Sequence, residues 1–120
     1  MYTLRNGLKA FGFFRGLVYG DREYSEDLDV YRNFENNIDR NAVLEHMRSA
    51  ECGLCPICGS RADILDGEEF DYMGPGIYED GPYTFPTEFP HYYEKYNLGI
   101  PPEYEEYLKS IGVGESKEAA

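Results

Sequence analysis

The sequence predicts an α+β fold: one small domain that combines two main helices, short strands, a tight cysteine-bearing turn and an extended segment rich in Pro and Tyr. Three observations support this class. The chain of 120 residues has the length of one domain. Two segments show apolar residues at helical spacing between helix start and stop signals. All seven prolines and eight of the twelve tyrosines follow residue 55, and such dense Pro excludes long helices and central strands.

The first segment, residues 2–19, admits two interpretations. Asn6 and Gly7 between two leucines are typical of a type I′ hairpin turn. Apolar residues also recur at helical spacing, and on a helix Gly12, Gly16 and Gly20 would form one stripe of small residues. We expect core packing with the glycines at turns. The alternative is a helix that approaches a partner helix closely.

Two helices are predicted further along the chain. The first covers residues 38–50, with Asn36 or Asn37 as its cap and an apolar face of Ile, Ala, Val and Met. The second begins at Pro101 and Pro102 and ends before Gly112. The polar residues 21–29 are predicted to form a loop. Residues 71–90 predict an extended, turn-rich path, with one short strand pair around residues 64 and 70.

Charge divides the chain unevenly. Its formal net charge is −12, and residues 51–120 carry 15 of the 23 acidic side chains. We expect one domain over residues 1–112, made of an N-terminal half (1–62) and an acidic Tyr/Pro-rich half (63–112), with a flexible tail at 113–120. The acidic balance argues against direct nucleic-acid binding. No apolar run approaches the ~18 residues of a membrane span.

Three cysteines, Cys52, Cys55 and Cys58, lie within seven residues. A disulfide scaffold normally has an even number of cysteines spread along the chain, so the pattern indicates a reducing compartment and a metal site. Pro56 fixes its own φ, and Gly59 permits a positive φ. Both features suit a tight turn whose thiolates bind one Zn²⁺ ion.

The run Cys55-Pro56-Ile57-Cys58-Gly59 resembles the CPxCG knuckle of zinc ribbons. With the following Ser-Arg-Ala it is similar to the first half of small phage zinc-ribbon proteins of the Lar restriction-alleviation type. The resemblance implies a zinc site, but a ribbon needs a second Cys-x-x-Cys, and no cysteine follows Cys58. His91 is the preferred fourth ligand, because the intervening chain can form the hairpin that a ribbon uses. His46 is the local alternative.

Two alternatives to zinc remain. Cys-x-x-Cys-x-x-Cys also begins the bacterial ferredoxin run, but the next cysteine of that run would stand where this chain has Ala62. Without metal, the same residues would form a tight turn with buried thiols. No GxSxG, Walker or HExxH motif occurs, and three thiolates are typical of a closed structural zinc site. We therefore expect no enzymatic activity.

The second half interleaves tyrosines with carboxylates. Tyrosine provides rigid contact area, and carboxylates steer a protein towards basic partners. This favours a docking surface for the basic groove of another protein, formed by Tyr72, Tyr78, Glu79, Asp80, Tyr83, Tyr92 and Tyr93. The alternative is that the tyrosines fill a small core while the acids keep the protein in solution.

The resulting hypothesis is a small acidic zinc-binding interaction protein of phage or viral origin. It would bind and modulate, for instance inhibit, a basic protein partner that handles nucleic acid, without contacting nucleic acid or membrane itself. We expect it in the host cytoplasm or in a virion. The alternative is a structural subunit of a virion or other large assembly, in which the Pro/Tyr-rich segment lies along neighbouring subunits.

Overall fold

A mixed sheet joins the two halves of the chain. The computed structural model describes residues 2–4, 7–17, 25–54, 59–72 and 77–114, with the backbone alone at 51–54, 59–61 and 70–72. Within these residues the sheet has five strands in the order β1-β2-β7-β6-β3. Their bounds are β1 Tyr2–Thr3, β2 Lys9–Ala10, β3 Glu51–Leu54, β6 Ile77–Asp80 and β7 Tyr83–Pro86. Strand β2 pairs parallel with β7, and the other neighbours pair antiparallel.

An N-terminal hairpin is confirmed, but the predicted type I′ turn on Asn6 and Gly7 is wrong, because the register sets Leu4 opposite Leu8 and leaves no two-residue loop at 6–7. Tyr2 lies opposite Ala10, and the amide of Gly7 donates to the carbonyl of Leu4 at 3.0 Å. Gly12 and Gly16 have φ angles of +77° and +98°, so they lie at turns. The alternative of a glycine-striped helix is therefore wrong for these two positions, while residue 20 lies outside the described residues.

Both predicted helices are present, as α2 Arg40–Arg48 and α4 Pro102–Ser110. The side chain of Asp39 caps α2 by accepting from a backbone amide of its first turn, whereas Asn36 bonds to the backbone of Ile100 instead. Gly112 follows α4 with a φ of +87°, as expected at a helix end. No helix among the described residues has both the length and the apolar character to cross a membrane.

Two short helices were not predicted. Helix α1, Leu28–Arg32, begins inside the expected loop because Leu28 and Tyr31, one turn apart, both pack into the core. Helix α3, Phe89–Lys95, begins where the sequence predicts an extended path. Pro90 lies in its first turn, where the missing N–H costs nothing.

A separate hairpin of β4 (Gly59–Ala62) and β5 (Glu69–Tyr72) confirms the predicted strand pair. Ile64 lies in its connecting turn rather than in a strand. The turn is closed by a bond from the Asp63 amide to the carbonyl of Glu68 at 2.8 Å. Strands β3 and β4 flank residues 55–58, which lie outside the described residues, and they pair with different partners, β6 and β5 respectively.

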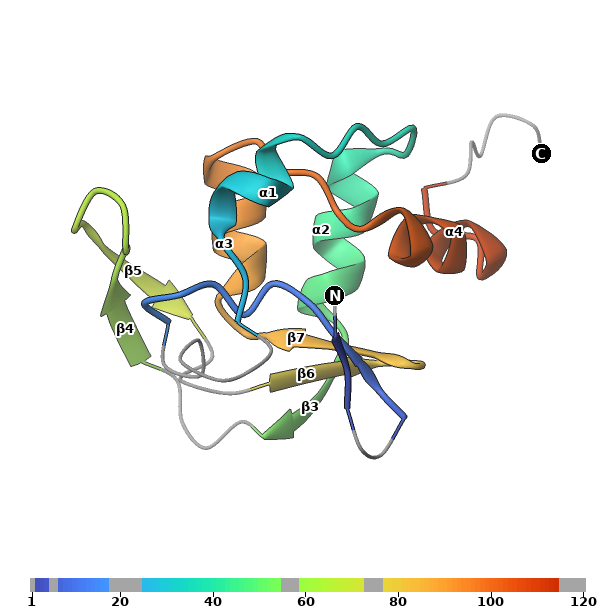
Figure 1. Ribbon diagram of the computed structural model, residues 1–120, viewed down its shortest axis with the longest axis horizontal. Helices are drawn as coiled ribbons and strands as arrows, with labels where there is room; N and C mark the ends of the chain where they lie inside the picture. Colours follow the sequence, from blue (N-terminus) through green and yellow to red (C-terminus); the bar gives the residue numbers. More distant parts are fainter. Residues whose placement is uncertain (1, 5–6, 18–24, 55–58, 73–76, 115–120) are drawn as a thin grey trace.

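The core lies between the five-stranded sheet and the helices, which occupy one side of that sheet (Figure 1). It is aromatic and draws on both halves of the chain: the ring centroids of Phe11 and Tyr104 are 4.7 Å apart, and Phe11 also contacts Phe85 and Phe89. Val113 packs against this core and donates to the carbonyl of Leu108. Packing therefore extends past residue 112, and 115–120 lie outside the described residues.

Replacing Gly12 by Ala should destabilise the protein strongly. A Cβ at Gly12 would lie 2.6 Å from Cδ1 of Phe89, on a backbone with positive φ. Left-handed backbone and overpacking each cost roughly 1–3 kcal/mol, so we expect the free energy of unfolding, measured by urea denaturation, to fall by about 2–4 kcal/mol.

Gly7→Ala is the matched control. Its φ is +89°, but nothing lies within 4 Å of the added Cβ. Only the backbone strain remains, so the expected loss is about 1 kcal/mol. Equal losses at the two positions would contradict the packing argument.

Candidate functional site

The predicted metal ligands are only partly described. Cys52 lies in β3, opposite Tyr78 of β6 in the strand register. Its side chain, and all of Cys55 and Cys58, lie outside the described residues. Among the described residues, no three His, Cys, Asp or Glu side chains form a group that could hold a metal ion. The cysteine site therefore stays a prediction, whereas both candidate histidines are described.

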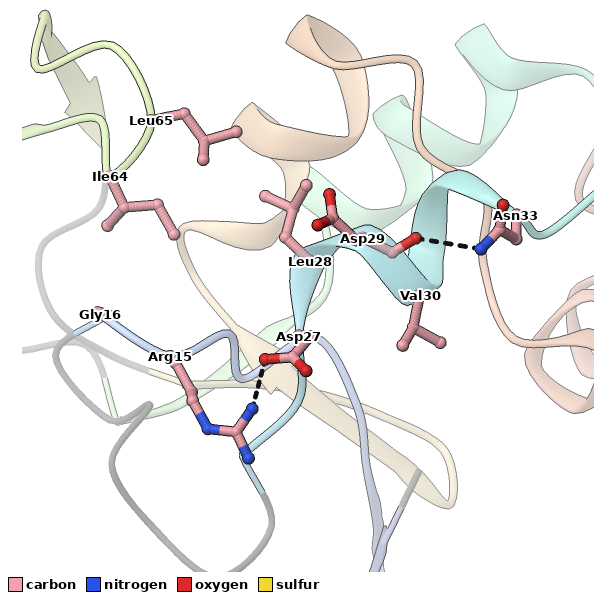
Figure 2. Close-up of a pocket in the computed structure, with 9 residues that line it drawn as sticks. All are labelled: Arg15, Gly16, Asp27, Leu28, Asp29, Val30, Asn33, Ile64 and Leu65. Atoms are coloured by element: carbon pink, nitrogen blue, oxygen red, sulfur yellow. Dashed lines mark hydrogen bonds and ion pairs between the residues drawn. The ribbon is translucent and has the colours of Figure 1, made fainter.

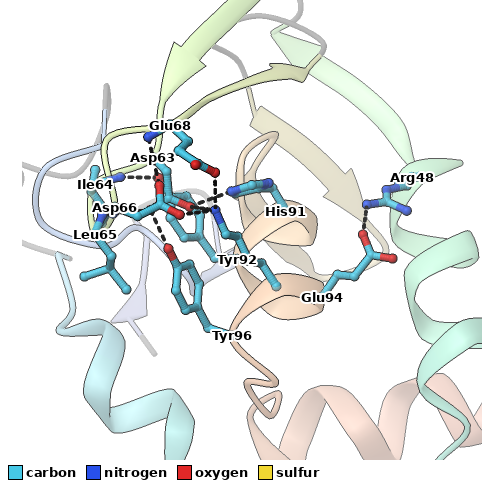
Figure 3. Close-up of polar contacts among 11 residues, drawn as sticks. Arg48, Asp63, Ile64, Leu65, Asp66, Glu68, His91, Tyr92, Glu94 and Tyr96 are labelled. Carbon is cyan, nitrogen blue, oxygen red and sulfur yellow. Dashed lines mark hydrogen bonds and ion pairs between the residues drawn. The ribbon is translucent and has the colours of Figure 1, made fainter.

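His91 points from α3 towards a buried carboxylate at the end of β4 (Figure 3). Asp63 is only 2% exposed. Its Oδ2 accepts from Nε2 of His91 at 2.8 Å and lies 3.5 Å from Nζ of Lys95. Its Oδ1 accepts from the hydroxyl of Tyr96 at 2.8 Å and from the amide of Leu65 at 2.7 Å. These donors replace the water that a buried carboxylate loses.

The same contacts fix the protonation states of the cluster. Burial raises the pKa of Asp63, but the hydrogen bonds from His91, the Leu65 amide and Tyr96 outweigh it and hold that pKa well below its usual range. Burial and the bond to Asp63 raise the pKa of Tyr96 to about 12. Asp63 is therefore a carboxylate at neutral pH, and since a carboxylate only accepts, Nε2 of His91 carries the proton.

This cluster fastens the β4–β5 hairpin to α3. The ammonium of Lys95 pairs with Asp66 and lies 3.9 Å from the carboxylate of Glu68. The hydroxyl of Tyr92 accepts from the amide of Ile64 at 2.9 Å. The hydrogen bond from Lys95 lowers the pKa of Asp66 and raises that of Lys95. The cluster acts as a polar clamp between the two elements.

His46 makes a comparable contact on the other side of the core. From α2, its Nε2 lies 2.9 Å from Oδ2 of Asp80, which is buried at the end of β6. The hydroxyl of Tyr104 donates to the same oxygen at 2.7 Å, and burial followed by the charge of Asp80 raises the Tyr104 pKa. In metal sites, a carboxylate on one ring nitrogen orients the other towards the ion. Both histidines have such a partner, so both stay candidates.

The predicted partner-binding residues are mostly buried. Four of their tyrosines are at most 5% exposed: Tyr78, Tyr83, Tyr92 and Tyr93. Asp80 is also buried, Glu79 is exposed, and the side chain of Tyr72 lies outside the described residues. The expectation of an exposed tyrosine surface is corrected for these four rings. The chain has no Trp, and its Tyr and Phe rings fill the core that aliphatic residues are too few to fill.

The basic side chains that the structure describes form ion pairs or hydrogen bonds with other groups of the protein. Every Lys and Arg side chain that the structure describes is engaged: Lys9 with Glu103, Arg15 with Asp27, Arg32 with Asp29, Arg48 with Glu94, Lys95 with Asp63 and Asp66, Lys109 with Glu105, and Arg40 with the carbonyls of Tyr93 and Leu98. Six exposed carboxylates form no ion pair with a described residue: Glu35, Asp39, Glu45, Glu69, Glu79 and Glu106. Among the described charged side chains, those available to a partner are therefore carboxylates.

A pocket of about 610 Å³ lies between α1, the β4–β5 turn and residues 15–16 (Figure 2). It is lined by Arg15, Gly16, Asp27, Leu28, Asp29, Val30, Asn33, Ile64 and Leu65. Sequence reasoning missed it because α1 was not predicted, and because Leu65 reaches the pocket from a distant turn. Neither segment alone carries a binding pattern.

Replacing Asp63 by Asn should loosen the hairpin. Asn keeps the size but presents an NH₂ donor where Asp63 has an acceptor, and that donor would face other donors. We expect the free energy of unfolding to fall by about 2–3 kcal/mol, with faster hydrogen exchange at the amides of Leu65 and Asp66, which both donate to Asp63. The exposed Glu69→Gln is the control.

The variant should also change the acid stability. The folded-state pKa of Asp63 is depressed, so its contribution is present above the unfolded-state pKa of about 4. That contribution is lost as the pH falls from there through the folded-state pKa. Asp63→Asn should therefore lose less stability than the wild type over this interval in urea titrations. Identical acid profiles would contradict the role given to Asp63.

Comparisons with protein-family models, with curated proteins and with solved structures find no match to this chain.

Proposed function

We propose that the protein is an acidic interaction module that docks on a basic surface of another protein. The observation that carries this proposal is the use of charge. Six of the described basic side chains form ion pairs within the protein and Arg40 donates to carbonyl oxygens, while exposed carboxylates such as Glu45, Glu79 and Glu106 have no ion pair with a described residue. On a chain of net charge −12, they produce a field that speeds encounter with basic surfaces and repels nucleic acid.

A protein that handles nucleic acid is the partner that best fits this charge. Such proteins carry clustered Lys and Arg that neutralise phosphates. Carboxylates held on a folded surface can occupy the same cations and so compete with the nucleic acid. The module would modulate its partner by this competition, without a chemical step of its own.

The proposal predicts salt-sensitive binding. The test is the affinity of the full chain for a panel of purified basic nucleic-acid-binding proteins, measured by calorimetry at low and at physiological ionic strength. We expect binding that weakens by about tenfold or more as salt is raised, and displacement of the module by a short DNA duplex. Absence of binding to every member of the panel at low salt would refute it.

Two double variants with the same change in net charge test which carboxylates contribute to binding. Glu45→Gln with Glu106→Gln removes two unpaired carboxylates, whereas Glu94→Gln with Glu103→Gln removes two that Arg48 and Lys9 already engage. The first double variant should weaken binding by about threefold, and the second should have less effect. Equal effects would show that net charge alone, and not the unpaired carboxylates, accounts for the affinity.

We also propose that Zn²⁺ bound by Cys52, Cys55 and Cys58 braces the chain where it passes from β3 to β4, with His91 or His46 as the fourth ligand. The cysteine spacing supports the ion. The two strands that flank the turn pair with different partners, so a local crosslink would stabilise the passage. Thiolate-held zinc can supply folding free energy directly to a small domain.

Elemental analysis tests the zinc proposal. Protein purified without chelator should contain one zinc ion per chain, and Cys55→Ser should lose it. Of His91→Ala and His46→Ala, one should lower the zinc affinity and the other should not. Bound iron with visible absorbance, or zinc retained in full by Cys55→Ser, would contradict the proposed site.

A further inference from the structure

We infer that the pocket beside α1 anchors the partner: an extended partner segment places aliphatic side chains against Val30 and against Leu65, and a Lys or Arg at Asp27 and Asp29. This inference rests on the proposed docking function and names the place and chemistry of the contact. It commits to a basic-aliphatic protein segment as the occupant.

The apolar part of the pocket is unusually exposed for this chain. Among the described residues the exposed large apolar side chains are Tyr2, Val30, Leu65 and Ile111. Val30 and Leu65, at 48% and 49% exposure, both line this pocket, next to the buried Leu28. Two half-exposed aliphatic side chains in the lining of one pocket mark contact area that a partner would cover.

The rim of the pocket supplies the charge complementarity. Asp27 and Asp29 have side chains that are 65% and 87% exposed. Asp27 uses Oδ1 for Arg15, and Asp29 uses Oδ1 for Arg32. Both carboxylates stay largely exposed although each pairs with an arginine. A cation from a partner can therefore join these pairs without breaking them, as a network of charges rather than a substitution.

Both walls of the pocket are held before any partner arrives. Leu28 and Tyr31 pack α1 into the core, and the hydroxyl of Tyr31 donates to Glu26 at 2.6 Å. The opposite wall is the turn that the Asp63 cluster clamps, through the amide of Leu65 at 2.7 Å. Preformed walls lower the entropic cost of binding. Val30 and Leu65 both line the pocket, and Leu28 of α1 lies between them in the view of Figure 2.

The experiment is a titration of the ¹⁵N-labelled full chain with a short amidated peptide of alternating leucine and lysine. Amide shifts should concentrate at residues 27–30 and 64–65. Leu65→Ser should weaken the peptide by about fivefold, and Asp29→Asn by about threefold. A peptide with serine in place of leucine should bind more weakly and should not respond to Leu65→Ser.

Ile111→Ser is the matched control, since Ile111 is 48% exposed and does not line the pocket. It should leave the affinity unchanged. If Leu65→Ser and Ile111→Ser behave alike while the Glu45→Gln, Glu106→Gln double variant still weakens a basic protein, the docking function stands and this inference is overturned. A dimer that Leu65→Ser converts to a monomer would also overturn it, because the occupant would then be a second copy.

Discussion

The hydroxyl groups of a tyrosine-rich core are the constraint on which this fold depends. A buried Tyr hydroxyl must keep a hydrogen-bond partner. Carboxylates provide it for the buried Tyr31 and Tyr104, through Glu26 and Asp80, and Asp63 does the same for the partly buried Tyr96, at 2.6–2.8 Å. Each carboxylate accepts a further bond, from the Gly12 amide, His46 and His91 respectively. The contacts of Asp80 and Asp63 join different elements, so the polar bonds that satisfy these rings also fix how the helices lie on the strands.

The acidic residues therefore have different roles inside the protein and at its surface. Carboxylates such as Asp63 and Asp80 are structural: they lie inside, and their charge is balanced by local donors. Others, such as Glu103 and Glu94, are used by the chain's own cations. Among the described charged side chains, those that form no ion pair with another described residue are carboxylates, because the described basic side chains are engaged. The surface charge therefore follows from pairing as much as from composition.

Sequence patterns predicted the elements whose signals are local. Helices α2 and α4 carry their own apolar stripes and end signals, and the N-terminal hairpin carries a turn-forming Gly7, although not in the type I′ turn that Asn-Gly predicts. Helix α3 was missed because prolines and glycines precede it, and only packing of Phe89 against the core reveals that Pro90 opens a helix. The role of Asp63 could not be predicted, because its partners in α3 lie far away in sequence. Alternating tyrosines and acids are compatible with either an exposed surface or a core. The structure places four of the tyrosines predicted to bind a partner in the core: Tyr78, Tyr83, Tyr92 and Tyr93.

The clamp at Asp63 connects folding to recognition. Its Oδ1 receives the amides of Leu65 and Asp66 and so shapes the turn, while its Oδ2 receives His91 from α3. The turn shaped in this way is one wall of the pocket beside α1, and Leu65 is presented from it. A carboxylate that is itself buried therefore determines where an exposed aliphatic side chain lies. Because β4 connects residues 55–58 to Asp63, a metal ion bound by the cysteines, as proposed, would act on the same hairpin from its other end. The stability of the hairpin and the shape of the pocket therefore depend on the same contacts of Asp63.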